Sequence, residues 1–223
     1  MQYLYHSQAG ASHLQLTGDM HRYLFKVRRH RVGETIGLRN LNDQILYDYH
    51  IDQLDKKMAL LQKSGERELH IVAKQQLHIG WCIVDPKSIE KVLPILNEMG
   101  VKKITFIYCQ RSQNGFRIDF DRFEKILLNS LQQCGRSEMM ILDEVESLVL
   151  FLEANPNSWM LNFSDQILDT DVQHIKTLLI GAEGGFSEEE CNMIETSKIV
   201  GLDTPLILRS ESAVCAAVSK LLL

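Results

Sequence analysis

The sequence predicts an α/β protein in which a small β-barrel precedes a largely parallel sheet covered by helices. Up to about residue 72, short apolar runs are separated by turn residues. From residue 77 onwards, strand-like runs alternate with amphipathic helices. A glycine-rich turn then follows an apolar strand near residue 180. Alternation of strands with helices is typical of parallel sheets whose strands are joined by helical crossovers.

Composition indicates a folded protein of one or two domains. Of its 223 residues 45% are hydrophobic and 24% are charged, which is ordinary for a globular chain. No apolar run approaches the roughly 20 residues that cross a bilayer, and the N-terminus lacks the pattern of a signal peptide. The five cysteines are scattered without a Cys-x-x-Cys pair, so neither a disulfide framework nor a zinc site is indicated. We therefore expect a cytoplasmic protein without membrane association or bound metal.

Positive charge gathers near the N-terminus although the net charge is −5. Residues 1–72 hold ten Lys and Arg against eight Asp and Glu, whereas the remainder holds fourteen against twenty-one. The basic cluster lies between His21 and Arg39, opposed only by Glu34, and consists of Arg22, Lys26, Arg28, Arg29, Arg31 and Arg39. Such a cluster suits contact with a phosphate backbone. A solvated basic loop is the alternative.

In the first segment, strands are predicted at residues 35–39, 45–51 and 57–61, with spacing typical of a small barrel. Residues 21–28 fit a helical turn or a strand equally well. In the second segment, strands are predicted at residues 77–84, 104–108, 159–163 and 177–180. We place the domain boundary between residues 68 and 76, which gives domains 1–72 and 73–223.

Two helices of the second segment are marked by their apolar faces. One begins at Asp85-Pro86, is striped by Ile89, Val92, Leu93 and Leu96, and ends at Gly100. Pro94 is expected to kink it. The other carries Phe120, Phe123, Ile126, Leu127 and Leu131 on one face.

The sharpest local motif is Gly181-Ala-Glu-Gly-Gly-Phe-Ser187, where an apolar strand meets a helix start. Ser187 and Glu190 form a capping box, and the glycines allow close approach of a ligand to the backbone. Neither a P-loop nor a dinucleotide fingerprint is present. Glu183 would repel a phosphate, which favours a neutral or cationic ligand over a phosphate-binding enzyme. A purely structural turn is the alternative reading.

A second motif, Leu206-Ile-Leu-Arg-Ser-Glu-Ser-Ala213, also joins an apolar stretch to a helix start, with Ser210 as the expected N-cap. Arg209 and Glu211 either carry chemistry or pair with each other as a structural clasp. The helix that follows is rich in small residues and is expected to pack closely.

These two motifs resemble Gly-Pro-Glu-Gly-Gly-Phe-Ser and Ile-Leu-Arg-Thr-Glu-Thr-Ala, signatures of the ribosomal RNA small subunit methyltransferase E family. The sequence is similar to that family over nearly its whole length, including the stretches at residues 21–28, 97–101, 111–112 and 133–136. Ala182 and Asp203-Thr204 are departures from the family pattern.

The resemblance implies S-adenosylmethionine-dependent methylation of N3 of a uridine in 16S ribosomal RNA, acting on the naked RNA or on the assembled small ribosomal subunit. It also implies a trefoil-knotted SPOUT domain preceded by a PUA-like RNA-binding domain. Three loops would then form the cofactor pocket, with these residues at the cofactor: Leu161, Asn162, Gly181, Glu183, Gly184, Gly185, Gly201, Leu202, Leu206 and Leu208.

Methyl transfer needs no metal, because the sulfonium methyl is already electrophilic and the nucleophile has only to be aligned with it. A cation near a carbonyl oxygen of the base would stabilise the deprotonated uridine. We expect Arg209 in this role, with Arg111 and Arg136 as alternatives for base or phosphate. Glu211 is a candidate base, although a position at a helix N-terminus favours its ionised form and a structural role.

RNA contacts are expected at Arg22, Arg28, Arg29, Arg31 and Arg136. The closing helix, residues 212–223, is expected to pair two copies into a homodimer. The competing interpretation is a non-catalytic RNA-binding module with a decayed cofactor pocket, which only the departures from the family pattern favour.

Overall fold

The computed structural model describes residues 2–112, 115–169 and 174–223, which divide into two compact units. Unit 1 consists of Met1–Val72 with Leu131–Met139, and unit 2 consists of Ala73–Ser130 with Met140–Leu223. Residues 131–139, which the sequence analysis assigned to the second domain, thus group with unit 1.

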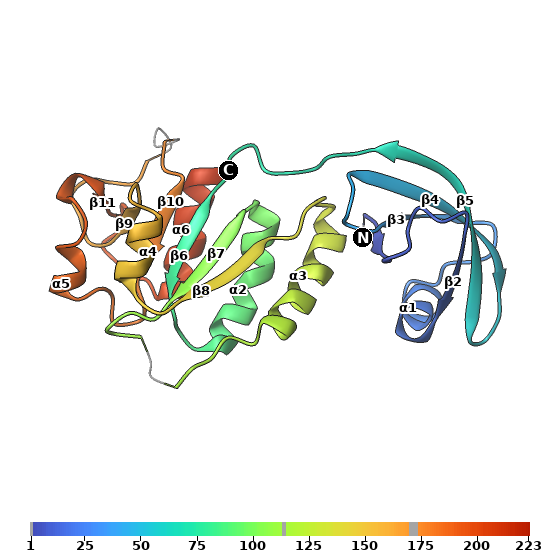
Figure 1. Ribbon diagram of the computed structural model, residues 1–223, viewed down its shortest axis with the longest axis horizontal. Helices are drawn as coiled ribbons and strands as arrows, with labels where there is room; N and C mark the ends of the chain where they lie inside the picture. The colour runs from blue at the N-terminus through green and yellow to red at the C-terminus, as the bar shows by residue number, and fades with distance from the viewer. Residues whose placement is uncertain (1, 113–114, 170–173) are drawn as a thin grey trace. The chain divides into compact units, whose positions relative to one another are not determined.

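Unit 1 is built on one five-stranded sheet with the order β1-β3-β4-β5-β2. Its strands are β1 (Leu4–Tyr5), β2 (His13–Thr17), β3 (Thr35–Arg39), β4 (Ile45–Leu54) and β5 (Met58–Glu68). Two register shifts in the β4–β5 pair interrupt the ladder, and such bulges bend a sheet. The sheet is therefore curled (Figure 1), with β1 and β2 as its edges. The strands predicted at residues 35–39, 45–51 and 57–61 correspond to β3, β4 and β5.

The segment after β2 is helical, which resolves the ambiguity at residues 21–28. It forms α1 (Gly18–Arg22) and the π-helical turn η1 (Tyr23–Val27). Leu24 is fully buried in the core of unit 1. His21 is also buried and shares a hydrogen bond with the carbonyl oxygen of Asp55 at 3.1 Å, which ties α1 to the turn between β4 and β5.

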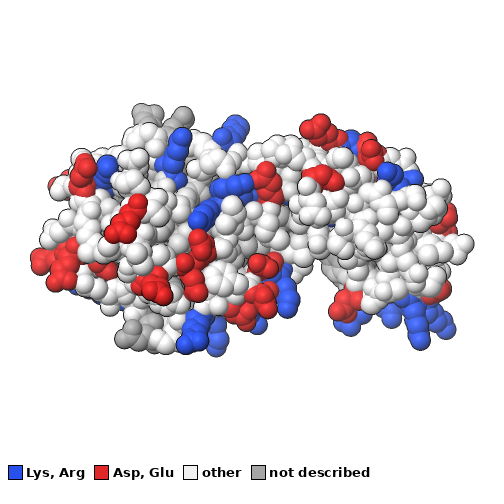
Figure 2. Space-filling model, in the orientation of Figure 1, with Lys and Arg blue, Asp and Glu red and all other residues white. Residues whose placement is uncertain are grey.

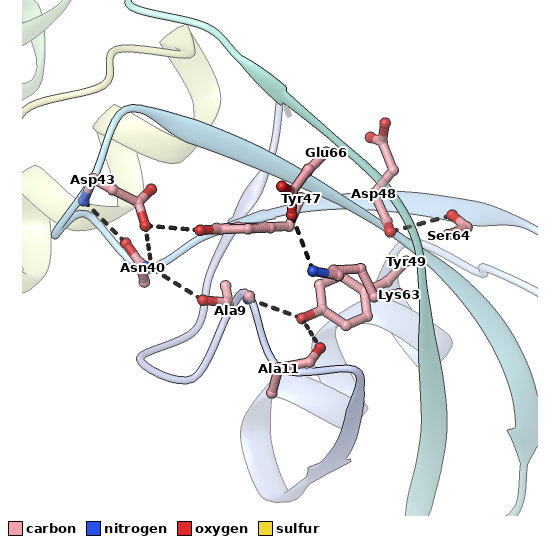
Figure 3. A network of polar contacts seen from close by, with 11 residues as sticks. Ala9, Ala11, Asn40, Asp43, Tyr47, Asp48, Tyr49, Lys63, Ser64 and Glu66 are labelled. Carbon is pink, nitrogen blue, oxygen red and sulfur yellow. Dashed lines mark hydrogen bonds and ion pairs between the residues drawn. The ribbon is translucent and has the colours of Figure 1, made fainter.

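Two tyrosines of β4 hold loops against the sheet: Tyr49 binds the loop between β1 and β2, and Tyr47 binds the turn between β3 and β4 (Figure 3). The Tyr49 hydroxyl donates to the carbonyl oxygen of Ala11 at 2.6 Å and accepts from the backbone N–H of Gly10 at 2.9 Å. The Tyr47 hydroxyl donates to Asp43 Oδ2 at 2.8 Å. Burial, followed by this hydrogen bond, raises the pKa of Tyr47 to about 12, so its hydroxyl remains a donor at neutral pH.

Arg39 does not belong to the basic surface that the sequence predicted. Its side chain is 1% exposed, Nη2 donates to the carbonyl oxygen of Leu69 at 2.5 Å, and the guanidinium lies over the Tyr3 ring, 5.1 Å from its centroid. A buried arginine needs such partners because removing its charge from water is costly. Arg39 is therefore a structural residue of unit 1.

Unit 2 is built on a six-stranded sheet with the order β11-β9-β10-β6-β7-β8, and all its strand pairs are parallel. The strands predicted at residues 77–84, 104–108, 159–163 and 177–180 are β6 (His78–Cys82), β7 (Lys103–Ile107), β9 (Trp159–Leu161) and β10 (Thr177–Ile180). Two further strands of this sheet, β8 (Ile141–Val145) and β11 (Ile199–Val200), were not predicted from the sequence.

The helices joined to this sheet are α2 (Pro86–Met99), α3 (Phe120–Cys134), α4 (Leu148–Ala154), α5 (Glu188–Cys191) and α6 (Ser210–Leu222), with a 3₁₀ turn η2 (Thr196–Lys198) before β11. The predicted ends of α2 are confirmed: the Asp85 side chain accepts from the backbone N–H of Lys87, and Gly100 adopts φ of 100°. The helix continues through Pro94 to Met99. Helix α6 packs against α2 and β10.

A disulfide joins Cys82, the last residue of β6, to Cys109, just beyond β7, with their Cα atoms 5.7 Å apart. The expectation that the cysteines form no disulfide was therefore wrong. Neighbouring parallel strands bring these two positions together, a proximity that a separation of 27 residues does not reveal. Among the described residues, no helix is long and apolar enough to cross a membrane.

Candidate functional site

The candidate site lies where three neighbouring strands of unit 2 end. Because β9, β10 and β11 are parallel, their carboxyl ends share one edge of the sheet, where open α/β sheets bind ligands. The loops that follow these strands line a single cavity of about 680 Å³, a volume within the usual range for small-molecule sites.

All ten residues predicted at the cofactor line this cavity. It is also lined by residues that the sequence analysis did not select: Phe163, Ser164, Asp165, Ile180, Ala182, Phe186, Thr204, Ile207, Ser210 and Ala213. Several of them stand next to predicted residues, as Phe163 does beside Asn162, so extending each loop by one or two positions would have found them. Phe163 and Ile207 are 81% and 83% exposed, so a large apolar surface lies at the cavity mouth.

The glycine-rich loop is a tight turn that continues into α5. The backbone N–H of Gly185 donates to the carbonyl oxygen of Ala182 at 2.9 Å, and Gly185 has φ of 68°, a conformation that favours glycine. The predicted capping box is confirmed: Ser187 Oγ accepts from the backbone N–H of Glu190, and the Glu190 carboxylate accepts from that of Ser187. The helix start is thus fixed directly beside the cavity.

A glycine is required at position 201, where the loops after β9 and β11 touch. A Cβ atom at this position would lie 2.5 Å from the carbonyl oxygen of Ser164, far inside van der Waals contact. The backbone N–H of Leu168 donates to the carbonyl oxygen of Gly201 at 2.7 Å, and the N–H of Gly201 donates to that of Gln166 at 2.8 Å. These bonds hold the loops after β9 and β11 together as one wall.

Asn162 and Cys191 close the wall between β9 and α5. The Nδ2 group of Asn162 donates to Cys191 Sγ at 3.2 Å. Burial raises the pKa of the Cys191 thiol. The thiol is therefore neutral at pH 7, and this disfavours a nucleophilic role.

The electrostatics of the cavity favour a cationic ligand. Asp165 and Glu183 are the only ionisable side chains among the described residues that line it. Two carboxylates without a lining Lys, Arg or His make the cavity a poor site for phosphate and a favourable one for a positive group. This agrees with the cationic or neutral ligand expected from Glu183.

Ser210 is not the N-cap of α6, contrary to the prediction. The N-cap position belongs to Arg209 and has no side-chain cap bond. Ser210 is the first helical residue and is 5% exposed. Its hydroxyl donates to the carbonyl oxygen of Gly181 at 2.5 Å and accepts from Trp81 Nε1 at 2.8 Å. The Ser210 hydroxyl therefore bonds to Gly181 and Trp81 instead of capping α6.

The three candidate catalytic side chains have different surroundings. Arg209 is exposed directly after the cavity-lining Leu208. Arg111 is exposed as well, and its Nη1 donates to the carbonyl oxygen of Gly184 at 2.8 Å. Glu211 has one carboxylate oxygen buried without a hydrogen-bond partner. No ion pair joins Arg209 to Glu211 within the described chain, so the alternative of a structural clasp between them is not observed.

Most of the predicted RNA-contacting arginines lie on the surface of unit 1. Arg22, Arg28, Arg29 and Arg31 are exposed, and Figure 2 shows basic side chains gathered where α1 lies. Arg28 Nε donates to the Tyr23 hydroxyl at 2.9 Å. Arg136 is different: it is 6% exposed and its carbonyl oxygen accepts from the Tyr3 hydroxyl at 2.6 Å. Its placement at the RNA is corrected to a structural role within unit 1.

Comparison with known proteins agrees with the fold and the cavity. Residues 72–222 match the RNA methyltransferase domain family. Fold, cavity and this match define an RNA methyltransferase domain. Ribosomal RNA small subunit methyltransferase E from two strains of Helicobacter pylori is 36% identical over 96% of this chain and 96% of its own length. The chain belongs to the ribosomal RNA small subunit methyltransferase E family.

Solved structures share the fold. Ribosomal RNA small subunit methyltransferase E from Neisseria gonorrhoeae, bound to S-adenosyl methionine, has a TM-score of 0.78 at 18% identity and covers 98% of this chain and 95% of that chain. A methyltransferase from Legionella pneumophila in complex with the same cofactor also has a TM-score of 0.78, at 24% identity. The match covers 99% of this chain and 96% of that chain. The predicted fold class, an α/β methyltransferase domain behind a small β-domain, is confirmed.

Proposed function

We propose that this protein transfers a methyl group from S-adenosylmethionine to N3 of a uridine in 16S ribosomal RNA, in the naked RNA or in the small ribosomal subunit, in the cytoplasm. The observation that carries the proposal is the cavity formed by the loops after β9, β10 and β11. Family membership supplies the reaction class, and the cavity supplies a place where a small cofactor meets exposed arginines.

The lining residues fit this cofactor chemically. Leu206 and Leu208 offer apolar surface to the adenine ring, and the glycine backbones of the loops after β10 and β11 leave room for close approach. The carboxylates of Asp165 and Glu183 complement a cation. When bound, S-adenosylmethionine supplies an electrophilic methyl group on a positively charged sulfur.

Arg209 is the proposed catalytic cation. Uridine N3 carries a proton at neutral pH, and its removal leaves negative charge on the base carbonyl oxygens. Arg209 follows directly on the cavity wall and is exposed, so its guanidinium can donate to such an oxygen. Arg111, which stands over Gly184 on the opposite loop, is proposed to contact the base or a neighbouring phosphate. Glu211 is a candidate base, and its partly buried place in the first turn of α6 favours a structural role.

Calorimetry with S-adenosylmethionine and with ATP tests the cofactor assignment. We expect binding of S-adenosylmethionine and no binding of ATP, because the cavity wall is acidic. Mass spectrometry of nucleosides from treated 16S ribosomal RNA should then detect 3-methyluridine. RNA binding without cofactor binding would favour the non-catalytic module instead.

Arg209→Ala should lower kcat by roughly a hundredfold, whereas Arg209→Lys should retain part of the wild-type kcat.

Residues 1–72 are proposed to act as a PUA-like RNA-binding domain and residues 73–223 as the catalytic domain. The basic surface of unit 1 supports this division, since Arg22, Arg28, Arg29 and Arg31 are exposed on or beside α1 and η1. Electrostatic contact with phosphates is the usual source of non-specific RNA affinity.

A two-fold homodimer through α6 is also proposed, with each active site using the RNA-binding surface of the partner. Small and apolar residues dominate this helix, and closed symmetric pairs are the commonest assemblies. Mixing an Arg209 variant with a basic-surface variant should restore activity after subunit exchange. A monomer in light scattering at micromolar concentration contradicts the dimer, whereas a dimer without complementation places each site within one chain.

A further inference from the structure

A single buried carboxylate joins the glycine-rich loop to the loop that carries Arg111. Glu190 lies on α5 and is 2% exposed. Its Oε2 accepts from the backbone N–H of Ser187 at 2.8 Å, and its Oε1 accepts from the backbone N–H of Gln110 at 2.9 Å. The first bond belongs to the capping box of α5. The second reaches a different part of the fold, the loop that follows β7.

Two surface contacts join the same loops. Gln110 Nε2 donates to Glu189 Oε2 at 2.8 Å, and Arg111 Nη1 donates to the carbonyl oxygen of Gly184 at 2.8 Å. Gln110, Arg111 and Glu189 are all exposed, so water competes for these contacts and each holds the loop weakly. Glu190 is shielded from water, and its bond to the backbone is charge-assisted and stronger.

The position of Arg111 depends on this bond because Arg111 is the next residue after Gln110. The Cβ and Cδ atoms of Arg111 each lie 3.4 Å from the place where a Cβ on Gly184 would be. The stem of the arginine thus covers the glycine, and its guanidinium stands at the edge of a loop that lines the cavity. A shift of the Gln110 backbone would move both.

We propose that Glu190 is a positioning residue for RNA methylation, in addition to capping α5. Its carboxylate fixes the backbone at Gln110 so that Arg111 is held over Gly184, ready to meet the RNA. The proposal rests on the role proposed above for Arg111. A helix cap alone requires only the bond to Ser187, and the second carboxylate oxygen is the part that links the two loops.

The chain offers a matched pair of variants. Glu190→Gln keeps the size of the side chain, but an amide has one acceptor oxygen, so one of the two N–H groups loses its partner. Ser187→Ala removes the other half of the capping box, where Ser187 Oγ accepts from the backbone N–H of Glu190 at 3.1 Å, and leaves the Gln110 bond intact. Both variants should lose similar thermal stability, measured by circular dichroism.

Only Glu190→Gln should change the Arg111 loop. The single amide oxygen is expected to stay on Ser187, which lies in the same helical turn, so hydrogen exchange of the Gln110 amide should accelerate in Glu190→Gln and stay slow in Ser187→Ala. Turnover on 16S ribosomal RNA should fall roughly tenfold in Glu190→Gln, as expected for a misplaced catalytic contact, with calorimetric affinity for S-adenosylmethionine retained. Equal exchange and equal turnover in the two variants would overturn the proposal.

A double-mutant cycle separates this proposal from the role of Arg111. If Glu190 acts through Arg111, adding Glu190→Gln to Arg111→Ala should lower turnover by no more than about twofold further. Independent, multiplying effects overturn the positioning role alone and leave Arg111 in place. Full turnover of Arg111→Ala by itself overturns the role of Arg111 and the positioning role together.

Discussion

The hydroxyl of Ser210 donates a hydrogen bond of 2.5 Å to the carbonyl oxygen of Gly181, so the first residue of α6 is bound to the first residue of the glycine-rich loop. The same oxygen accepts from the indole N–H of Trp81, which is fully buried in β6. One small side chain thus connects the sheet, the loop and the closing helix.

Ser210→Ala should therefore destabilise the protein and loosen the cavity. The substitution leaves the Trp81 N–H buried without an acceptor, which costs about 1–3 kcal/mol. We expect a lower unfolding temperature and weaker binding of S-adenosylmethionine in calorimetry. Ser212→Ala, at an exposed position of the same helix, is the control and should behave as wild type. If the two variants bind the cofactor equally well, the contact is irrelevant to the cavity.

Gly184→Val should abolish cofactor binding in a folded protein. The atoms nearest to a Cβ at this position belong to the Arg111 side chain, at 3.4 Å, which is an ordinary contact, so the thermal transition should stay close to that of wild type. The two methyl groups would occupy space next to the cavity. Gly201→Ala is expected to lower the unfolding temperature, because its Cβ would lie 2.5 Å from a backbone oxygen. Retained binding in Gly184→Val argues against the site.

Charge reversal at Arg28, Arg29 and Arg31 should weaken RNA binding and reduce its salt dependence. Loss of three phosphate contacts lowers the slope of log affinity against log salt by about 2 to 3. Reversal of Lys87, Lys91 and Lys125, exposed on α2 and α3, changes the net charge equally and serves as the control. Fluorescence anisotropy at several salt concentrations measures both. Unchanged RNA affinity in the first variant would leave this surface as a solvated face.

The acidic cavity should distinguish the charged cofactor from its neutral-sulfur product. Asp165→Asn combined with Glu183→Gln removes both lining carboxylates. Each contributes about 1 kcal/mol towards a nearby cation, or roughly a fivefold change in affinity. S-adenosylmethionine should lose more affinity than S-adenosylhomocysteine in calorimetry. Asp203→Asn, in the loop after β11 but outside the cavity wall, should change neither. An equal loss for both ligands contradicts the charge argument.

Much of the fold follows from local sequence signals. Asp85 and Gly100 mark the ends of α2, and Ser187 with Glu190 marks the start of α5, because each cap depends on side chains within one turn. Buried strands such as β6 and β10 have continuous apolar sequences that stand out. The cavity residues were accessible to prediction because parallel strands end at one edge and because family resemblance pointed to three loops.

The features that escaped prediction depend on contacts between distant residues. The edge strand β8 alternates weakly and is largely exposed, and β11 has two residues, so neither has a strong pattern. Arg39 and Arg136 were predicted on the surface, since nothing nearby in the sequence indicates that the Tyr3 ring lies against the Arg39 guanidinium and that the Tyr3 hydroxyl donates to the carbonyl oxygen of Arg136. Ser210 has the sequence context of a helix cap, and its bonds to Gly181 and Trp81 depend on residues distant in the sequence.

The bond between Cys82 and Cys109 turns the crossover from β6 to β7 into a closed covalent ring that contains the whole of α2. The two ends of this crossover cannot separate while the bond is intact. A protease that cuts one peptide bond within residues 83–108 would open the ring without releasing a fragment. The nicked chain would run as one species on a gel without reductant and as two with it. The strand that leads into α2 and the loop that leads to Arg111 therefore move as one linked piece.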